Sequence, residues 1–187
     1  MIRIINLFFI IFFLLSAKAY SLIEIDITRG NLDPLPIAVS PLFQDDNSKR
    51  NSINELKIEN VGSEISLVVE NNLKISGLFN PLSKEAFLQK PDIAHLKPRF
   101  EDWALIKAQA LITGKVTIED KKLKVEFRLW DILAGREMMA LAFTTVPSNW
   151  RRVGHIISDK VYERLTGEKG YFDTRIIYVS EEGPKTA

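Results

Sequence analysis

The sequence of 187 residues contains no cysteine and only two histidines, His95 and His155. The absence of cysteine excludes disulfides, thiol catalysis and cysteine-ligated metals, so the hydrophobic core alone must stabilise the fold. The two histidines lie far apart and form no His-x-x-x-His pair, which argues against a metal site. Phosphate-binding loops, dinucleotide fingerprints and nucleophile elbows are also missing. We therefore predict no cofactor, no metal, no catalytic residue and no enzymatic activity.

The remaining candidates for catalysis have simpler structural explanations. His155 and Asp159 are four residues apart in a predicted helix, and without a nearby nucleophile we interpret them as an ion pair on a solvated face. Glu101 and Asp102 are adjacent, so their side chains diverge by about 100° on a helix. We expect both acids in the first turn of that helix, where they complement its dipole.

The three tryptophans are candidates for binding or for core packing. Trp103 and Trp150 fall on the apolar sides of predicted helices, which favours core packing. Trp130 falls at the end of an alternating strand, and the pattern leaves both interpretations open for it.

The first 19 residues have the layout of a secretory signal. Arg3 precedes the uninterrupted apolar run LFFIIFFLL (7–15), and small residues follow at Ala17 and Ala19. A membrane-spanning helix needs about 20 apolar residues, and this run is shorter. We predict cleavage between Ala19 and Tyr20 and export to the periplasm, with an uncleaved anchor as the alternative because Lys18 is unusual in a cleavage motif. No cysteine is available for a lipid anchor.

The charges are balanced. The chain has 25 Lys and Arg against 24 Asp and Glu, a net charge of +1, and removal of residues 1–19 takes away two bases and no acid. Such a near-neutral domain lacks the clustered basic face that nucleic acids require. We predict no nucleic-acid partner and, after cleavage, no membrane-spanning segment.

The hydrophobic pattern of the mature chain predicts five strands and two main helices. Alternation or β-branched runs indicate strands at 22–28, 36–40, 111–118, 123–130 and 137–145. Apolar stripes at helical spacing indicate main helices at 63–76 and 149–166, with short helices at 83–89 and 100–109. This order predicts an α+β fold, a two-layer α/β sandwich in which a five-stranded mixed sheet carries both main helices on one face.

Two further segments are predicted to be loops. Residues 44–52 (QDDNSKRNS) contain no apolar side chain, and residues 79–82 (FNPL) read as an exposed loop with one apolar anchor.

Several stretches resemble the amino-terminal region of the TolB family. They are IDITRGNLDPLPIAVSPLF (25–43), SGLFNPL (76–82), ALITGKV (110–116), FRLWDILAGRE (127–137) and NWRRVGHIISDKVYERLTGEKGYFDTRIIYVS (149–180). The resemblance implies an α/β domain at 20–168 that a six-bladed β-propeller follows in the family. Residues 169–187 would then be a linker with the first strand of that propeller, at 175–179, which has no partner in this chain.

The resemblance also implies partners. The family is a scaffold of the Tol-Pal envelope system, which supports outer-membrane integrity and envelope constriction during cell division. Its principal surface for the lipoprotein Pal is the propeller, which these residues do not include. Its mature amino-terminal segment is implicated in binding the C-terminal domain of TolA. By position, that segment is Tyr20, Ser21, Leu22, Ile23, Glu24, Ile25, Asp26 and Ile27.

An alternating strand at a free terminus suits TolA binding, because it can add to the edge of a partner's sheet. Its alternative role is as a strand of the domain's own sheet. For the chain as a whole, the alternatives are a truncated, non-functional remnant and a stand-alone domain that binds a small ligand.

Overall fold

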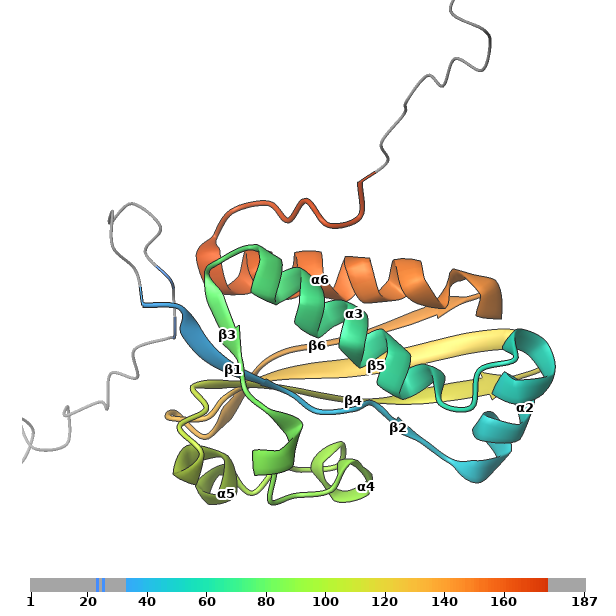
Figure 1. Cartoon of the computed structure of the whole chain (residues 1–187), viewed down its shortest axis with the longest axis horizontal. Helices are drawn as coiled ribbons and strands as arrows, with labels where there is room; N and C mark the ends of the chain where they lie inside the picture. The colour runs from blue at the N-terminus through green and yellow to red at the C-terminus, as the bar shows by residue number, and fades with distance from the viewer. Residues whose placement is uncertain (1–22, 24, 26–32, 175–187) are drawn as a thin grey trace, which may run out of the picture.

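The chain folds into a mixed sheet with helices packed against it (Figure 1), seen in a computed structural model that describes residues 23, 25 and 33–174. The predicted signal segment, its cleavage site and the predicted strand at 175–179 lie outside the described residues. The described strands are β1 (Leu35–Val39), β2 (Phe43–Gln44), β3 (Phe79–Pro81), β4 (Ala110–Glu119), β5 (Lys122–Asp131) and β6 (Arg136–Thr145). The helices are α2 (Asp46–Leu56), α3 (Val61–Ile75), α4 (Pro91–Ala94), α5 (Phe100–Leu105) and α6 (Trp150–Thr166), with 3₁₀ turns at Lys84–Ala86 and Pro147–Asn149.

The sheet is mixed, in the order β3-β1-β4-β5-β6, and β2 pairs with β4 further along the same edge as β1. The β1–β3, β1–β4 and β2–β4 pairs are parallel, whereas β4–β5 and β5–β6 are antiparallel. The antiparallel part is a meander of three ten-residue strands joined by short turns. The predicted α+β class and mixed sheet are confirmed, with five strands in the main order and the two-residue β2 as a sixth.

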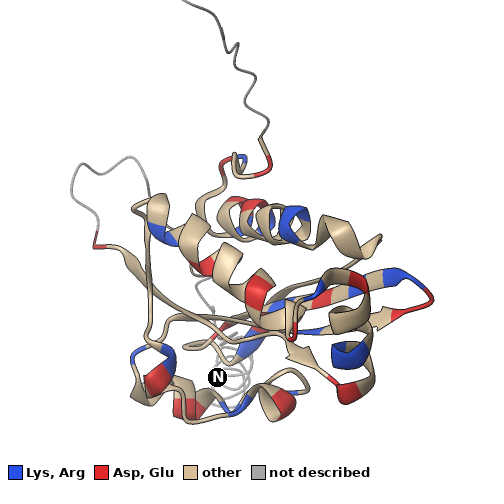
Figure 2. Cartoon of the chain, turned by 45° about the vertical axis from the view of Figure 1, so that its right-hand side comes forward, with Lys and Arg blue, Asp and Glu red and all other residues tan. Residues whose placement is uncertain are grey.

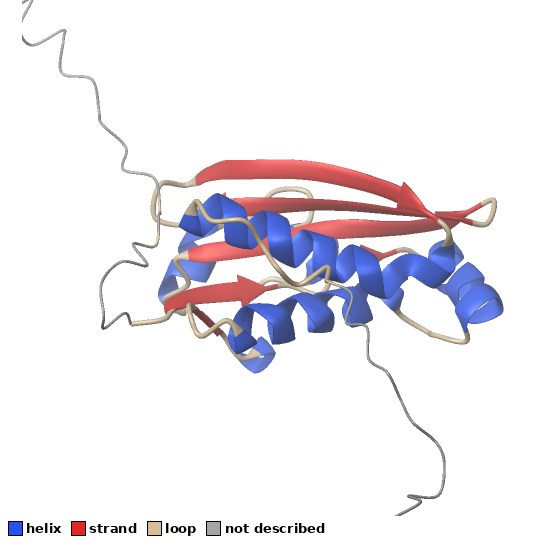
Figure 3. Ribbon diagram, turned by 90° about the horizontal axis from the view of Figure 1, so that it is seen from above, coloured by secondary structure: helices blue, strands red, loops and turns tan. Residues whose placement is uncertain are grey.

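The main core lies between one face of the sheet and the two long helices, α3 and α6 (Figure 3). The alternation predicted for β5 is confirmed, because Leu123, Val125, Phe127 and Leu129 are all buried in this core. The helical stripes are confirmed as well. Ile65, Val69 and Leu73 of α3 meet Val153, Ile157, Val161 and Leu165 of α6 in the same cluster.

A smaller second core covers part of the opposite face of the sheet, where the sequence predicted no layer. It is formed by α4, α5 and the loops beside them, and Trp103 and Trp130 lie at its centre. Trp130 donates from Nε1 to Thr113 Oγ1 at 2.8 Å, so its indole is both buried and hydrogen-bonded. The question that the sequence left open is therefore settled in favour of core packing for Trp130.

The prediction of a polar loop at 44–52 is wrong, since most of this segment belongs to α2. The prediction failed because this helix packs through hydroxyl groups instead of an apolar stripe. Ser48 and Ser52 are both buried, and the backbone amide of Ile118 in β4 donates to Ser48 Oγ at 3.2 Å. A helix that docks by hydrogen bonds leaves no hydrophobic periodicity in the sequence.

The exposed loop predicted at 79–82 is also wrong. Phe79 is only 3% exposed and begins β3, which pairs in parallel with β1. The strand predicted at 22–28 lies mostly outside the described residues. Its two described members, Ile23 and Ile25, are not part of a strand.

Asp45 caps the amino end of α2, and we expect its replacement to cost stability in a pH-dependent way. Its carboxylate accepts a hydrogen bond from the Ser48 amide at 2.8 Å, which is the largest cause of a lowered pKa for Asp45. A pKa lowered by folding stabilises the fold above the unfolded value of about 3.9, and this contribution is lost as the pH falls through the folded value.

Asp45→Ala should therefore lower the free energy of unfolding by about 1 kcal/mol at pH 7. The difference from the wild type should shrink below about pH 4, and urea titrations at several pH values would measure it. Asp45→Asn is the matched control, since it keeps an acceptor for the cap without a titrating group. A constant difference for Asp45→Ala down to pH 2 would contradict this account of the cap.

Candidate partner interface beside the last helix

The sequence-predicted catalytic candidates do not form a site. His155 Nδ1 lies 2.9 Å from Asn72 Nδ2 on α3, and the carboxylate of Asp159 accepts backbone amides of the segment after α6, so the predicted ion pair between them does not form. Glu101 and Asp102 lie in the first turn of α5, as predicted. Within residues 33–174, together with 23 and 25, no group of three or more His, Asp or Glu side chains could hold a metal ion.

The most distinctive surface feature is a groove between α6 and the outer strand β6. It has a volume of about 520 Å³, and Ile23 of the amino-terminal segment lines part of it. We call it the α6–β6 groove, and its lining is Ile23, Met139, Leu141, Lys160, Glu163, Arg164 and Gly167. Met139 and Leu141 lie on the face of β6 that is turned towards the helices, because they pair with the buried residues Leu129 and Phe127.

Two residues of the predicted TolA-binding segment dock at this groove. The backbone N–H of Ile25 donates to the carbonyl of Leu165, in the last turn of α6, at 2.7 Å. Ile23 and Ile25 are both half-buried and pack against the main core. The other predicted members of the segment (Tyr20, Ser21, Leu22, Glu24, Asp26 and Ile27) lie outside the described residues.

The carbonyl that receives Ile25 is free because α6 ends there. Gly167 adopts a left-handed conformation with φ of 75°, and its N–H bonds to the Glu163 carbonyl. The final carbonyls of a helix have no partner within the helix, so they accept from other parts of the chain. The helix end thus supplies the acceptor on which the amino-terminal segment docks.

The charged side chains of the groove are paired with each other or with the backbone. Lys160 Nζ lies 2.8 Å from Glu163 Oε2, and this contact raises the pKa of Lys160 and lowers that of Glu163. Arg164 Nε donates to the Met138 carbonyl at 3.4 Å. Met138 is an extra residue in the register between β5 and β6, so Arg164 caps the carbonyl of a β-bulge.

The strand β6 is the outermost strand on its side of the sheet order, and its outer edge borders the groove. Leu141 is 39% exposed, and Ala140 and Ala142 beside it are exposed. Residues 137–145 contain no lysine or proline, which are the residues that commonly protect edge strands from pairing with other chains.

The charge distribution bears on nucleic-acid binding, and the helices bear on membrane insertion. Basic and acidic residues are interspersed along the described helices and strands (Figure 2), whereas nucleic-acid binding needs a clustered basic face. No described helix has the length and apolar character needed to cross a bilayer.

These features define an α+β domain in which Ile23 and Ile25, from the amino-terminal part of the chain, dock beside an open strand edge. The chain belongs to the TolB family, because residues 23–138 match the TolB amino-terminal domain. This family is not enzymatic, which confirms the prediction that the chain is not an enzyme.

Two comparisons show how the chain relates to known proteins. It is 78% identical over 178 residues to the Tol-Pal system protein TolB of Pelagibacter ubique (strain HTCC1062). That alignment covers 95% of this chain but 40% of the relative, so the chain spans well under half of the relative's length. The crystal structure of TolB from Acinetobacter baumannii has the same fold, with a TM-score of 0.59 at 22% identity over 75% of this chain and 30% of that one.

Proposed function

We propose that this chain is a periplasmic protein-interaction component of the Tol-Pal system, which binds the C-terminal domain of TolA through Tyr20–Ile27. In this role it supports outer-membrane integrity and envelope constriction during cell division. Membership of the TolB family and the 78% identity to a Tol-Pal system protein support this assignment. We further propose that the mature chain begins at Tyr20, which would place the binding segment at a free terminus.

The observation that carries the proposal is that Ile23 and Ile25 are held to the domain only by partial burial and by one backbone hydrogen bond. Full burial of an isoleucine side chain stabilises by about 1.5–3 kcal/mol, and both side chains are only half-buried. The single backbone hydrogen bond of Ile25 adds about 1 kcal/mol. Ordering a residue costs about 1–2 kcal/mol of backbone entropy, so docking of such a segment is close to balanced.

A nearly balanced segment can exchange between two partners. When docked, Ile23 lines the α6–β6 groove and the Ile25 amide bonds to the Leu165 carbonyl. When released, the alternation of Ile23, Ile25 and Ile27 with polar residues makes it suitable for adding to the sheet edge of another protein, with backbone hydrogen bonds giving affinity and the isoleucines specificity.

Replacing Ile25 by aspartate tests the proposal. We expect Ile25→Asp to weaken binding to the isolated C-terminal domain of TolA at least tenfold in calorimetric titration, because a charge replaces a specificity side chain. Ile93→Asp is the matched control, since it makes the same chemical change at an exposed isoleucine of α4. It should bind TolA as the wild type does.

Equal binding by Ile25→Asp and the wild type, with the circular dichroism unchanged, would overturn the proposal. Pal is a useful negative ligand in the same titrations. The principal Pal surface of the family belongs to the propeller, so we expect no Pal binding by these 187 residues.

The groove also bears on the alternative of a small-ligand-binding domain. Its volume of about 520 Å³ lies within the range of ligand pockets. However, Ile23 itself forms part of its wall, so the groove has this shape only while the amino-terminal segment is docked. This favours a seat for the amino-terminal segment over a pocket for a free ligand.

A further inference from the structure

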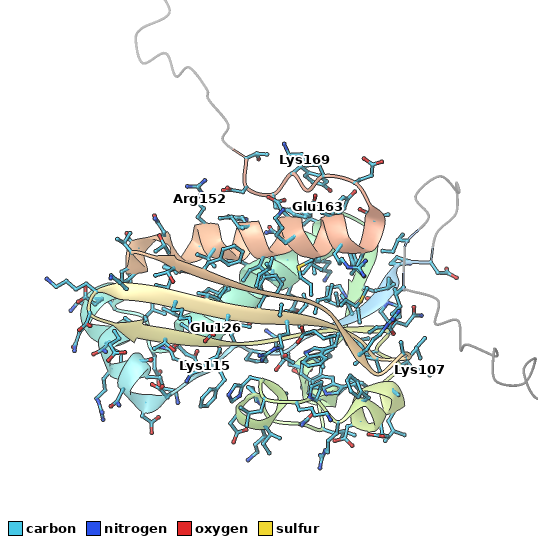
Figure 4. The ribbon with its side chains drawn as sticks, turned by 180° about the vertical axis from the view of Figure 1, so that it is seen from behind. Lys107, Lys115, Glu126, Arg152, Glu163 and Lys169 are labelled. Atoms are coloured by element: carbon cyan, nitrogen blue, oxygen red, sulfur yellow. The ribbon has the colours of Figure 1, made fainter. Side chains whose placement is uncertain are left out.

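The segment that follows α6 does not leave the domain directly. It turns back and runs along the side of α6 that faces away from the sheet (Figure 1). We call residues 168–174 the exit segment. Figure 4 shows Lys169 on this segment and Arg152, of the first turns of α6, on the side of the helix that the segment passes over.

The carboxylate of Asp159, at the middle of α6, holds the backbone of the exit segment. Its Oδ1 accepts the N–H of Phe172 at 2.7 Å, and its Oδ2 accepts the N–H of Asp173 at 3.1 Å. Hydrogen bonds from backbone N–H groups to an ionised carboxylate are stronger than those between neutral groups. One side chain thus fixes two consecutive peptide groups.

A second contact, between Arg152 and the carboxylate of Asp173, lies nearer to the start of α6. Arg152 donates from Nε to both oxygens of Asp173, at 3.1 and 3.2 Å, and from Nη2 to Oδ2 at 3.1 Å. The planar guanidinium fixes the direction of a carboxylate as well as its position. The last described residues are therefore attached to α6 at two points.

Aromatic packing and a close backbone approach complete the attachment. The ring of Tyr162 meets Tyr171 and Phe172 edge to face, with centroids 5.5 and 5.9 Å apart. A Cβ atom at Gly170 would lie 2.4 Å from the Cα of Asp159, so the segment approaches the helix at a distance that only glycine permits.

We propose that these contacts form a latch that holds the exit segment rigidly against α6 and so fixes the position and direction of the chain at residue 174. Four kinds of contact from one helix hold residues 170–173, more than a flexible connection requires. A flexible linker would instead be rich in small polar residues and would lack specific packing. This role is separate from the binding of TolA and does not depend on it.

The test is ¹⁵N relaxation and amide hydrogen exchange on the whole chain. We expect order parameters near 0.85 for residues 170–173, as for α6 itself, and slow exchange of the Phe172 and Asp173 amides. In Asp159→Ala the same order parameters should fall below about 0.6 and the two amides should exchange at least tenfold faster. Glu163→Ala is the matched control, because it removes an acid of the same helix whose main partner is Lys160 and which interacts only weakly with Lys169 of the exit segment.

Gly170→Ala provides an independent variant, which displaces the segment without removing a carboxylate and should loosen it in the same way. Protection of the α6 amides checks in each case that the domain is folded. Order parameters below 0.6 for residues 170–173 in the wild type would overturn the latch. Unchanged values in both Asp159→Ala and Gly170→Ala would overturn it equally.

Discussion

Replacing Trp103 by alanine should lower the free energy of unfolding by about 3–5 kcal/mol, the range for large aromatic residues in a core. Trp103 is 1% exposed and lies in the second core, on the face of the sheet opposite the long helices. Its ring meets Phe87 edge to face, with centroids 5.0 Å apart. Alanine would remove most of this buried side chain and leave a cavity in the second core.

The loss of a hydrogen bond adds to the cavity. Trp103 Nε1 donates to Gln89 Oε1 at 3.0 Å, and the same oxygen accepts the backbone N–H of Arg99. Because Gln89 is itself buried, removal of the indole leaves its oxygen with one partner fewer in an environment that water does not reach.

Urea titration followed by circular dichroism measures the effect of Trp103→Ala. Trp150→Ala is the matched control, since Trp150 is only half-buried and its ring lies under the Arg151 guanidinium at 4.8 Å. We expect it to cost less than half as much. A loss below about 1.5 kcal/mol for Trp103→Ala would mean that the second core unfolds separately from the rest of the domain.

The antiparallel half of the sheet and the long helices could be predicted because their apolar residues recur at the spacing of a strand or a helix with one buried face. Each of β4, β5 and β6 is ten residues long, and the buried residues of β5 alternate as a strand with one face in a core should. The last helix carries an apolar stripe and ends at Gly167, so both its face and its end were visible.

Part of the parallel half could not be predicted, because two of its strands are short and defined by distant partners. β1 was predicted at 36–40, but β3 has three residues and β2 has two, and each exists only through pairing with β1 or β4. The second core was missed for a related reason. α5 lies within the short helix predicted at 100–109, but α4 has only four residues, too few to show a helical period, so the layer that the two helices form was not predicted.

For the candidate site, the resemblance to the TolB family gave the proposed binding segment but not its seat. Ile23 and Ile25 belong to that segment by position, whereas Met139 and Leu141, which line the groove with Ile23, look like ordinary strand residues. The role of Asp159 was also hidden. A carboxylate that binds backbone amides needs no partner side chain, so nothing in the sequence around Phe172 indicates it.

Replacing Gly114 by alanine should destabilise the fold by about 3 kcal/mol, the upper part of the range for overpacking. A Cβ atom at Gly114 would lie 2.2 Å from the Glu126 carbonyl oxygen and 2.9 Å from Cδ2 of Leu42. The first contact is with the backbone of β5, which cannot rotate away as a side chain could. Alanine must therefore push two paired strands apart.

The position of Gly114 in the sheet explains why the fold needs this close approach. β1 pairs with β4 at residues 110–112, and β2 pairs with it at residues 115–116, so Gly114 lies between the two pairings on one edge of β4. Leu42, between β1 and β2, fills the space that a side chain at Gly114 would take. The strand that follows β1 can then rejoin the sheet and lead into α2.

Urea titration of Gly114→Ala would measure this cost, and Gly154→Ala on α6 is the matched control. At Gly154 the nearest atom to a new Cβ is Cγ1 of Val68, at 2.8 Å, and that contact is with a side chain of α3. Two helices can separate slightly where two hydrogen-bonded strands cannot, so Gly154→Ala should cost less. Equal losses for the two variants would show that the sheet yields at Gly114 as readily as the helix pair does at Gly154.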